Sequence, residues 1–194
     1  MTDKDAGEGK STREEILAKA GELFARKGYF GVSMQTIASE LKMTKAALYY
    51  HFPSKEKIYL NVLEETFGRL FNKLKTAAAE SRNPAETLFR VINSYLNFTL
   101  ENPQASLFYS SAAGEGSNAI RQVVSDIRQK MSRFFTDIFE MAEREEKQES
   151  ALAAELARML LGILANPFVW GKKEIGITAR FISNLFTAST SHGS

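Results

Sequence analysis

The chain has 194 residues, of which 44% are hydrophobic and 25% charged, a balance typical of a globular protein with a buried core. Its formal net charge is only +2, so a nucleic-acid-binding surface would have to be a local patch. The absence of cysteine excludes disulfides, thiol catalysis and thiolate metal sites. With His51 and His192 as the only histidines, we expect neither a metal nor a cofactor.

Two segments of the sequence indicate where in the cell the protein is located. The first ten residues are charged and polar and lack the apolar segment of a signal peptide. The longest apolar stretch, residues 152–170, is interrupted by Glu155, Arg158 and Pro167, which is not typical of a membrane span. We therefore expect a soluble cytoplasmic protein with no membrane partner.

Helical periodicity runs through almost every long segment and predicts an all-α fold of about nine helices. Thr12 and Glu15 fit a capping box at the start of the first helix, and Gly28 is expected to end it with a left-handed residue. The apolar stripe between them consists of Ile16, Ala20, Leu23 and Phe24.

The next two helices are short and close together. Ser33 is expected to cap the second, and Thr44 the third, with only Lys42 and Met43 between the two helices. Pro53 ends the third helix, because the residue before a proline avoids the helical region. Two short helices joined by a tight turn are typical of a helix-turn-helix that places one helix in the DNA major groove.

The rest of the chain predicts a larger helical bundle. Ser54 is expected to cap a fourth helix from Lys55 to about Glu80, and a fifth, apolar on most sides, runs from Asn83-Pro84 to about Leu100. A short helix, a long one with stripe residues from Ile120 to Met141, and two apolar helices at 152–165 and 175–188 follow. We expect a helix-turn-helix domain at residues 11–57 and a ligand-binding and dimerisation domain at 58–190.

The third helix carries groups suited to DNA. Lys45 and Tyr49 share one face, and the small Ala46 permits a close approach to bases. Ser54 and Lys55 place free backbone N–H groups and a positive charge at a helix start, where a phosphate binds well. The alternative is an ordinary surface helix, and periodicity alone does not decide between them.

Residues about 11–59 resemble the N-terminal domain of the tetracycline-repressor (TetR) family of bacterial transcription regulators. The most specific match is the run Leu48-Tyr49-Tyr50-His51-Phe52-Pro53-Ser54-Lys55, which follows the family pattern without departure. The resemblance implies DNA contacts at Ser33, Gln35, Thr36, Thr44, Lys45, Ala46, Tyr49, Tyr50, His51 and Lys55. It also implies that the remaining two-thirds, which shows only a compatible helix count, binds an effector and dimerises.

The second domain is rich in aromatic residues, which suit either a packed core or an apolar pocket with a few polar anchors. Candidate ligand-binding residues are Phe67, Phe71, Tyr95, Phe108, Tyr109 and Phe134, with Asn93, Asn97 and Thr99 as further polar anchors. These residues favour a hydrophobic or aromatic effector. An acidic effector held by Arg121 or Arg128 is the alternative.

The last two helices carry more apolar surface than a monomer core needs. The residues that we expect at a homodimer interface are Leu156, Met159, Leu160, Ile163, Ile182, Leu185 and Phe186. Burial within one monomer is the alternative. A two-fold dimer presents two recognition helices about one DNA turn apart, which suits a palindromic operator.

These features predict a homodimeric repressor that binds operator DNA and is released by a small-molecule effector. A helical enzyme is the first alternative, but no catalytic constellation can be assembled from these residues, and we expect no enzymatic activity. An adaptor that has lost DNA binding is the second. Loss would erode the recognition face, whereas Lys45, Tyr49, Tyr50, His51 and Lys55 are all present.

Overall fold

A computed structural model describes residues 11–81, 84–106 and 116–145. These ranges contain six α-helices, one 3-10 helix and no strand, which confirms the all-α fold. In chain order they are α1 (Thr12–Lys27), α2 (Met34–Glu40), α3 (Lys45–His51), α4 (Lys55–Ala79), α5 (Pro84–Glu101), η1 (Pro103–Ser106) and α7 (Asn118–Glu145). The other expected helices fall outside the described residues.

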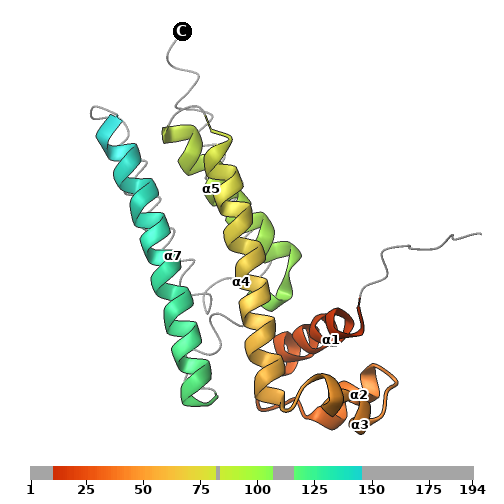
Figure 1. The fold of residues 1–194 in the computed structure, drawn as a ribbon. Coiled ribbons are helices and arrows are strands. Elements are labelled where there is room, and N and C mark those ends of the chain that lie inside the picture. Colours follow the sequence, from red (N-terminus) through yellow and green to blue (C-terminus); the bar gives the residue numbers. More distant parts are fainter. Residues whose placement is uncertain (1–10, 82–83, 107–115, 146–194) are drawn as a thin grey trace, which may run out of the picture.

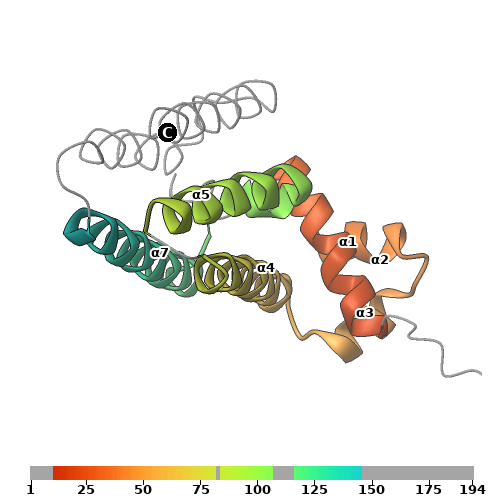
Figure 2. The same cartoon turned by 90° about the horizontal axis from the view of Figure 1, so that it is seen from above.

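The helices form two groups (Figure 1). We call α1, α2 and α3 the head, and α4, α5, η1 and α7 the body. In the body, α4, α5 and α7 lie side by side, and α5 returns toward the head antiparallel to α4 (Figures 1 and 2). The head is attached to one end of this bundle, because α1 packs against α4 and η1. The predicted domain boundary at residue 57 lies inside α4, so both groups share this helix.

The head has a small aromatic core. The rings of Phe24 on α1 and Tyr59 on α4 meet edge to face, with centroids 4.8 Å apart, and both side chains are buried. Leu48 and Phe52 are fully buried, as expected from their one-turn spacing. The Arg13 guanidinium lies 4.4 Å from the centre of the Phe52 ring. These contacts fix α3 and the end of α4 to α1.

Each helix of the head, and α4 after it, begins with a hydroxyl side chain. Ser33 Oγ accepts from the Thr36 N–H at 3.0 Å, and Thr44 Oγ1 from the Ala47 N–H at 3.1 Å, as predicted. Ser54 Oγ caps α4 in the same way through the Lys57 N–H at 3.1 Å. Free N–H groups at a helix start need such partners, so these three residues set where the helices begin.

The predicted capping box at Thr12 and Glu15 is wrong by one residue. The cap is Ser11, whose backbone is extended, and its Oγ accepts from the Glu14 N–H at 3.3 Å. The Glu14 carboxylate in turn accepts from the Ser11 N–H at 2.9 Å. Ser11 with Glu14 and Thr12 with Glu15 both have the spacing of a capping box, but Thr12 is already helical and cannot be the cap. Gly28, by contrast, ends α1 with a φ of 69°, as expected.

The turn between α2 and α3 is a Schellman motif. The Met43 N–H donates to the Ala38 carbonyl at 3.0 Å, and the Lys42 N–H to the Ser39 carbonyl at 3.1 Å. This pattern requires a left-handed residue after the helix end, and Lys42 takes that conformation with a φ of 55°. It is the only residue other than glycine with a positive φ in the described ranges. A lysine thus occupies a position that favours glycine.

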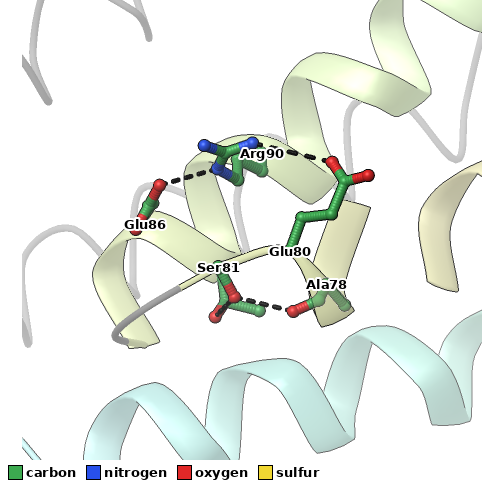
Figure 3. A network of polar contacts seen from close by, with 6 residues as sticks. Ala78, Glu80, Ser81, Glu86 and Arg90 are labelled. Atoms are coloured by element: carbon green, nitrogen blue, oxygen red, sulfur yellow. Dashed lines mark hydrogen bonds and ion pairs between the residues drawn. The ribbon is translucent and has the colours of Figure 1, made fainter. Parts of the chain in front are cut away.

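Polar contacts join α4 and α5 at the end of the bundle far from the head (Figure 3). Arg90 on α5 lies 3.8 Å from the Glu80 carboxylate and 2.7 Å from that of Glu86. Ser81 Oγ donates to the Ala78 carbonyl at 2.7 Å and also contacts the Thr87 hydroxyl. Exposed ion pairs stabilise little, so this network mainly fixes the geometry of the corner.

None of the helices in the described ranges is both long and apolar enough to cross a membrane.

The left-handed Lys42 gives a stability prediction. Lys42→Val is expected to lower the free energy of unfolding by about 1–2 kcal/mol, because a β-branched side chain is poorly tolerated at positive φ. Lys42→Gly is expected to change it by no more than about 1 kcal/mol, with the sign favouring glycine. Urea unfolding followed by circular dichroism measures both.

Lys57→Val is the control, since Lys57 lies exposed on right-handed α4. Its expected cost is about 0.5 kcal/mol, the ordinary propensity difference. Equal stability of Lys42→Val and the wild type would contradict the left-handed assignment.

Candidate nucleic-acid interface and effector region

The helix expected to read DNA, α3, buries only one of its residues. Leu48 points into the head, whereas Lys45, Ala46, Tyr49 and Tyr50 are exposed. Tyr50 is 88% exposed and Tyr49 45%, which is unusual for large rings in a folded protein. α3 also lies at the end of the molecule opposite to the junction of α4 and α5 (Figure 1). The predicted contact residues of this helix therefore share an accessible surface.

Two ring contacts order this surface. Lys45 Nζ lies 5.9 Å from the centre of the Tyr49 ring, one turn further along α3. The rings of Tyr50 and His51 meet edge to face at 5.4 Å, and His51 is half-buried. The lysine ammonium and the tyrosine hydroxyls are suitable donors to phosphate oxygens and base acceptors.

The predicted contact residues at the starts of α2 and α3 already have local partners. Ser33 Oγ lies 2.9 Å from Thr36 Oγ1, and the Gln35 side-chain amide donates to Ser39 Oγ at 3.2 Å. Thr44 caps α3. Ser33, Gln35 and Thr44 are nevertheless exposed, and Thr36 is half-buried. They lie on the two helices of the helix-turn-helix, so they remain candidates for DNA contact.

Lys55 has a partner that the sequence did not indicate. Its Nζ donates to the Tyr29 carbonyl at 2.8 Å and lies 4.1 Å from the centre of the Tyr29 ring. Partial burial lowers the pKa of the Lys55 ammonium below its ordinary value. The Tyr29 pKa is raised, first by burial and then by the charge of Glu56. Lys55 thus joins the start of α4 to the loop after α1.

An ammonium has three donors, and this hydrogen bond uses one of them. The phosphate-binding role predicted for Lys55 is therefore compatible with the Tyr29 contact. Tyr29 was not among the predicted site residues, and the two residues are 26 positions apart. Tyr29 lies within residues 11–59, which carry the family resemblance, but nothing in that stretch indicated a contact with Lys55.

Four of the six predicted ligand-binding residues lie in one aromatic row that crosses the body. Phe67 stacks on Phe71, with ring centroids 5.4 Å apart, and Phe71 meets Phe134 of α7 at 5.3 Å. Phe135, which the sequence did not single out for the pocket, joins Phe134 at 5.7 Å to Tyr95 of α5 at 5.8 Å. The row places side chains of α4, α5 and α7 in contact.

Other predicted residues lie elsewhere. Asn93 and Asn97 are exposed on α5, Arg121 and Arg128 are exposed on α7, and Thr99 is half-buried. Outside the described residues lie the pocket candidates Phe108 and Tyr109 and the whole predicted dimer interface, Leu156, Met159, Leu160, Ile163, Ile182, Leu185 and Phe186. Their roles remain predictions.

A groove of about 670 Å³ runs between α4 and α5, and none of the predicted ligand-binding residues lines it. Phe98 is its buried floor, and Lys73 and Glu101 form an ion pair of 3.3 Å at its wall. Arg69 and Glu80 add one charge of each sign. This balance gives the groove no preference for an anion or a cation. Among the described residues, no cluster of three His, Asp or Glu side chains is arranged to hold a metal ion.

Comparison with known proteins points to the same part of the chain. Residues 16–62 match the family model described as bacterial regulatory proteins, tetR family. The matched range includes the C-terminal three-quarters of α1, the whole of α2 and α3, and the first turns of α4.

Two curated relatives are similar over a longer range. The uncharacterized HTH-type transcriptional regulator YuxN of Bacillus subtilis is 29% identical over 79% of this chain and 53% of its own length. IcaR of Staphylococcus aureus, a negative regulator of the biofilm operon icaADBC, is 28% identical over 62% of this chain and 66% of its own length. The match thus spans about half to two thirds of these relatives.

A solved structure shows the same fold over most of the chain. AibR, in complex with isovaleryl coenzyme A and operator DNA, is 20% identical, with a TM-score of 0.68 over 85% of this chain and 94% of its own.

The Lys55 contacts predict two separable effects of Lys55→Ala. Loss of one phosphate contact is expected to weaken binding to specific and random duplexes by the same factor and to reduce the salt slope by about one unit. Loss of the Tyr29 hydrogen bond and ring contact is expected to lower the free energy of unfolding by about 1 kcal/mol. Fluorescence anisotropy over a salt series and urea unfolding measure the two effects.

Lys57→Ala is the matched control, because this exposed lysine lies in the same first turn of α4. It is expected to leave the stability unchanged. An unaltered salt slope in a folded Lys55→Ala variant would rule out the phosphate contact.

Proposed function

Because this chain belongs to the TetR family of bacterial regulatory proteins, we propose that it is a ligand-responsive transcriptional repressor. In this proposal it binds a palindromic operator as a homodimer in the bacterial cytoplasm, and an effector releases it. The relative IcaR is named as a negative transcriptional regulator, which supports repression rather than activation. AibR, solved with both operator DNA and an acyl-coenzyme A, supports the pairing of DNA with a small molecule.

The observation that carries the proposal is the exposed face of α3. A seven-residue helix that buries only Leu48 contributes little to the core, yet it presents Lys45, Ala46, Tyr49 and Tyr50 to solvent. Two caps and a Schellman turn hold its position. Such a helix has the dimensions and the donors to enter a major groove and contact base edges and phosphates.

The same observation separates this function from its alternatives. An adaptor has no need for an exposed, ordered row of lysine and tyrosine side chains on a turn-connected helix. An enzyme is disfavoured because the relatives above are named as regulators. We therefore assign no catalytic role to the chain.

We propose that the effector is hydrophobic or aromatic and binds beside the row of Phe67, Phe71, Phe134 and Tyr95. α4 carries the first two residues and begins at Ser54 and Lys55, next to the recognition helix. A tilt of this helix at the pocket changes the spacing of the two heads of a dimer. The effector must bind the non-DNA state more tightly, by a coupling of about 1–3 kcal/mol in typical cases.

The recognition face is tested with a duplex selected from a random library. The double variant Lys45→Ala/Tyr49→Ala is expected to lose binding to that duplex, and Lys45→Ala alone to lose about 1–3 kcal/mol if it reads a base. Lys19→Ala is the control, because this half-buried lysine lies on α1, away from α3 in the sequence, in an ion pair with Glu22. Unchanged binding by a folded double variant, or failure of the wild type to select any duplex, would refute the proposal.

The dimer is tested by introducing charge into the two helices predicted at residues 152–165 and 175–188. Ile163→Asp/Leu185→Asp is expected to give monomers or aggregates and to abolish operator binding, because apolar burial stabilises such an interface by about 25 cal/mol per Å². Ser183→Asp, outside the apolar stripe, is the control. Sedimentation that shows a monomeric wild type at micromolar concentration would contradict the dimer.

A further inference from the structure

Gly21 lies in the middle of α1 and is buried. Glycine destabilises a helix interior relative to alanine, so its presence there needs a reason. A Cβ at this position would lie 2.7 Å from Gln104 Cγ of η1 and 3.2 Å from Val62 Cγ1 of α4. The missing side chain therefore lets both body elements approach the α1 backbone directly.

η1 is tightly joined to the end of α5. The Asn102 N–H and the Asn102 side-chain amide both donate to the Phe98 carbonyl, at 2.9 and 2.8 Å. The Ala105 N–H donates to the Asn102 carbonyl at 2.9 Å, and Ala105 is buried. α5 and η1 therefore move together, as one corner of the body.

This corner lies against α1 in both views of the fold (Figures 1 and 2). At its other end, α5 is joined to α4 by the contacts of Arg90 with Glu80 and of Ser81 with Thr87 (Figure 3). Between the two ends, α5 carries Tyr95, a member of the aromatic row. The row is thus connected to the head twice, through α4 and through α5 with η1.

We propose that the contact of Gln104 with Gly21 is a second joint that couples the body to the DNA-binding head. Gln104 acts as a positioning residue: a displacement of α5 shifts η1, and the Gln104 side chain passes this shift directly to the α1 backbone at Gly21. The inference rests on the proposed function, since the coupling matters only if the head binds DNA. By reciprocity, DNA bound at the head must alter η1 to the same extent that η1 alters the head.

That reciprocity gives a test without a known effector. The probe is the duplex selected above, and the readout is hydrogen–deuterium exchange of peptides covering residues 98–106. In the wild type, the duplex is expected to change exchange in these peptides by about fivefold or more, as for a typical coupling. Gln104→Ala is expected to abolish that change while the peptides of α3 still respond to the duplex.

Two glycine variants sharpen the test. Gly21→Ala is expected to displace Gln104 and speed exchange in η1 before any DNA is added. Adding Gln104→Ala to it is expected to restore most of the slow exchange in η1, because this change removes the 2.7 Å overlap and leaves only the milder 3.2 Å approach to Val62 Cγ1. Gly68→Ala on α4 is the matched control, since a Cβ there meets nothing within 4 Å. It is expected to leave the duplex response unchanged.

The outcomes separate the joint from the proposed function. A duplex that binds the wild type without changing exchange at residues 98–106 would overturn the joint and leave the function standing. A response that persists in Gln104→Ala would also overturn it. Failure to bind any duplex would refute the proposed function, and the joint with it.

Discussion

The sharing of α4 between head and body is the constraint on which the rest of the structure depends. The buried side chains form one continuous hydrophobic cluster that reaches from Ile16 of α1 to Ile138 of α7. Among the described helices α4 contributes the most residues to this cluster, with Tyr59 packed on α1 at one end and Leu74 buried in the bundle near the other. Because protein cores are close-packed, a helix common to both parts cannot shift in one without repacking the other.

The head separates structural from exposed side chains. Serine and threonine hydroxyls at Ser33, Thr44 and Ser54 satisfy backbone N–H groups and fix where helices start. Buried Leu48 and Phe52 fix how α3 lies on α1 and α4. The lysine and tyrosines of α3 neither cap a helix nor pack in the core, so they are available to contact an external ligand. The position of this seven-residue helix is therefore fixed by its cap and by buried Leu48 and Phe52, and its other side chains are not needed for that.

The elements that local rules govern were predictable from the sequence. Ser33, Thr44, Gly28 and Pro53 marked helix ends correctly, because caps and breakers act within one turn of the chain. The misplaced first cap shows the limit of such rules, since Ser11 and Thr12 both have an acidic residue three positions later. Only the backbone conformation of Ser11 decides between them.

Contacts between distant residues could not be predicted in this way. The Lys55–Tyr29 bond spans 26 positions, and Gln104 reaches Gly21 across two elements. The left-handed conformation of Lys42 could not be predicted either, because glycine is the residue that usually indicates it and lysine does not. Four candidate ligand-binding residues lie in the aromatic row, but Phe135, which joins Phe134 to Tyr95, was not among the candidates.

The single buried residue of α3 has a consequence for the evolution of such proteins. Stability constrains Leu48 strongly, whereas substitutions at exposed helix positions usually change stability by no more than about 0.5 kcal/mol. The exposed positions of α3 are therefore nearly free to change in sequence while the fold persists. Two chains of this architecture can share every core contact of α3 and still present different surfaces, so the chemistry of this face is set by its exposed side chains rather than by the scaffold.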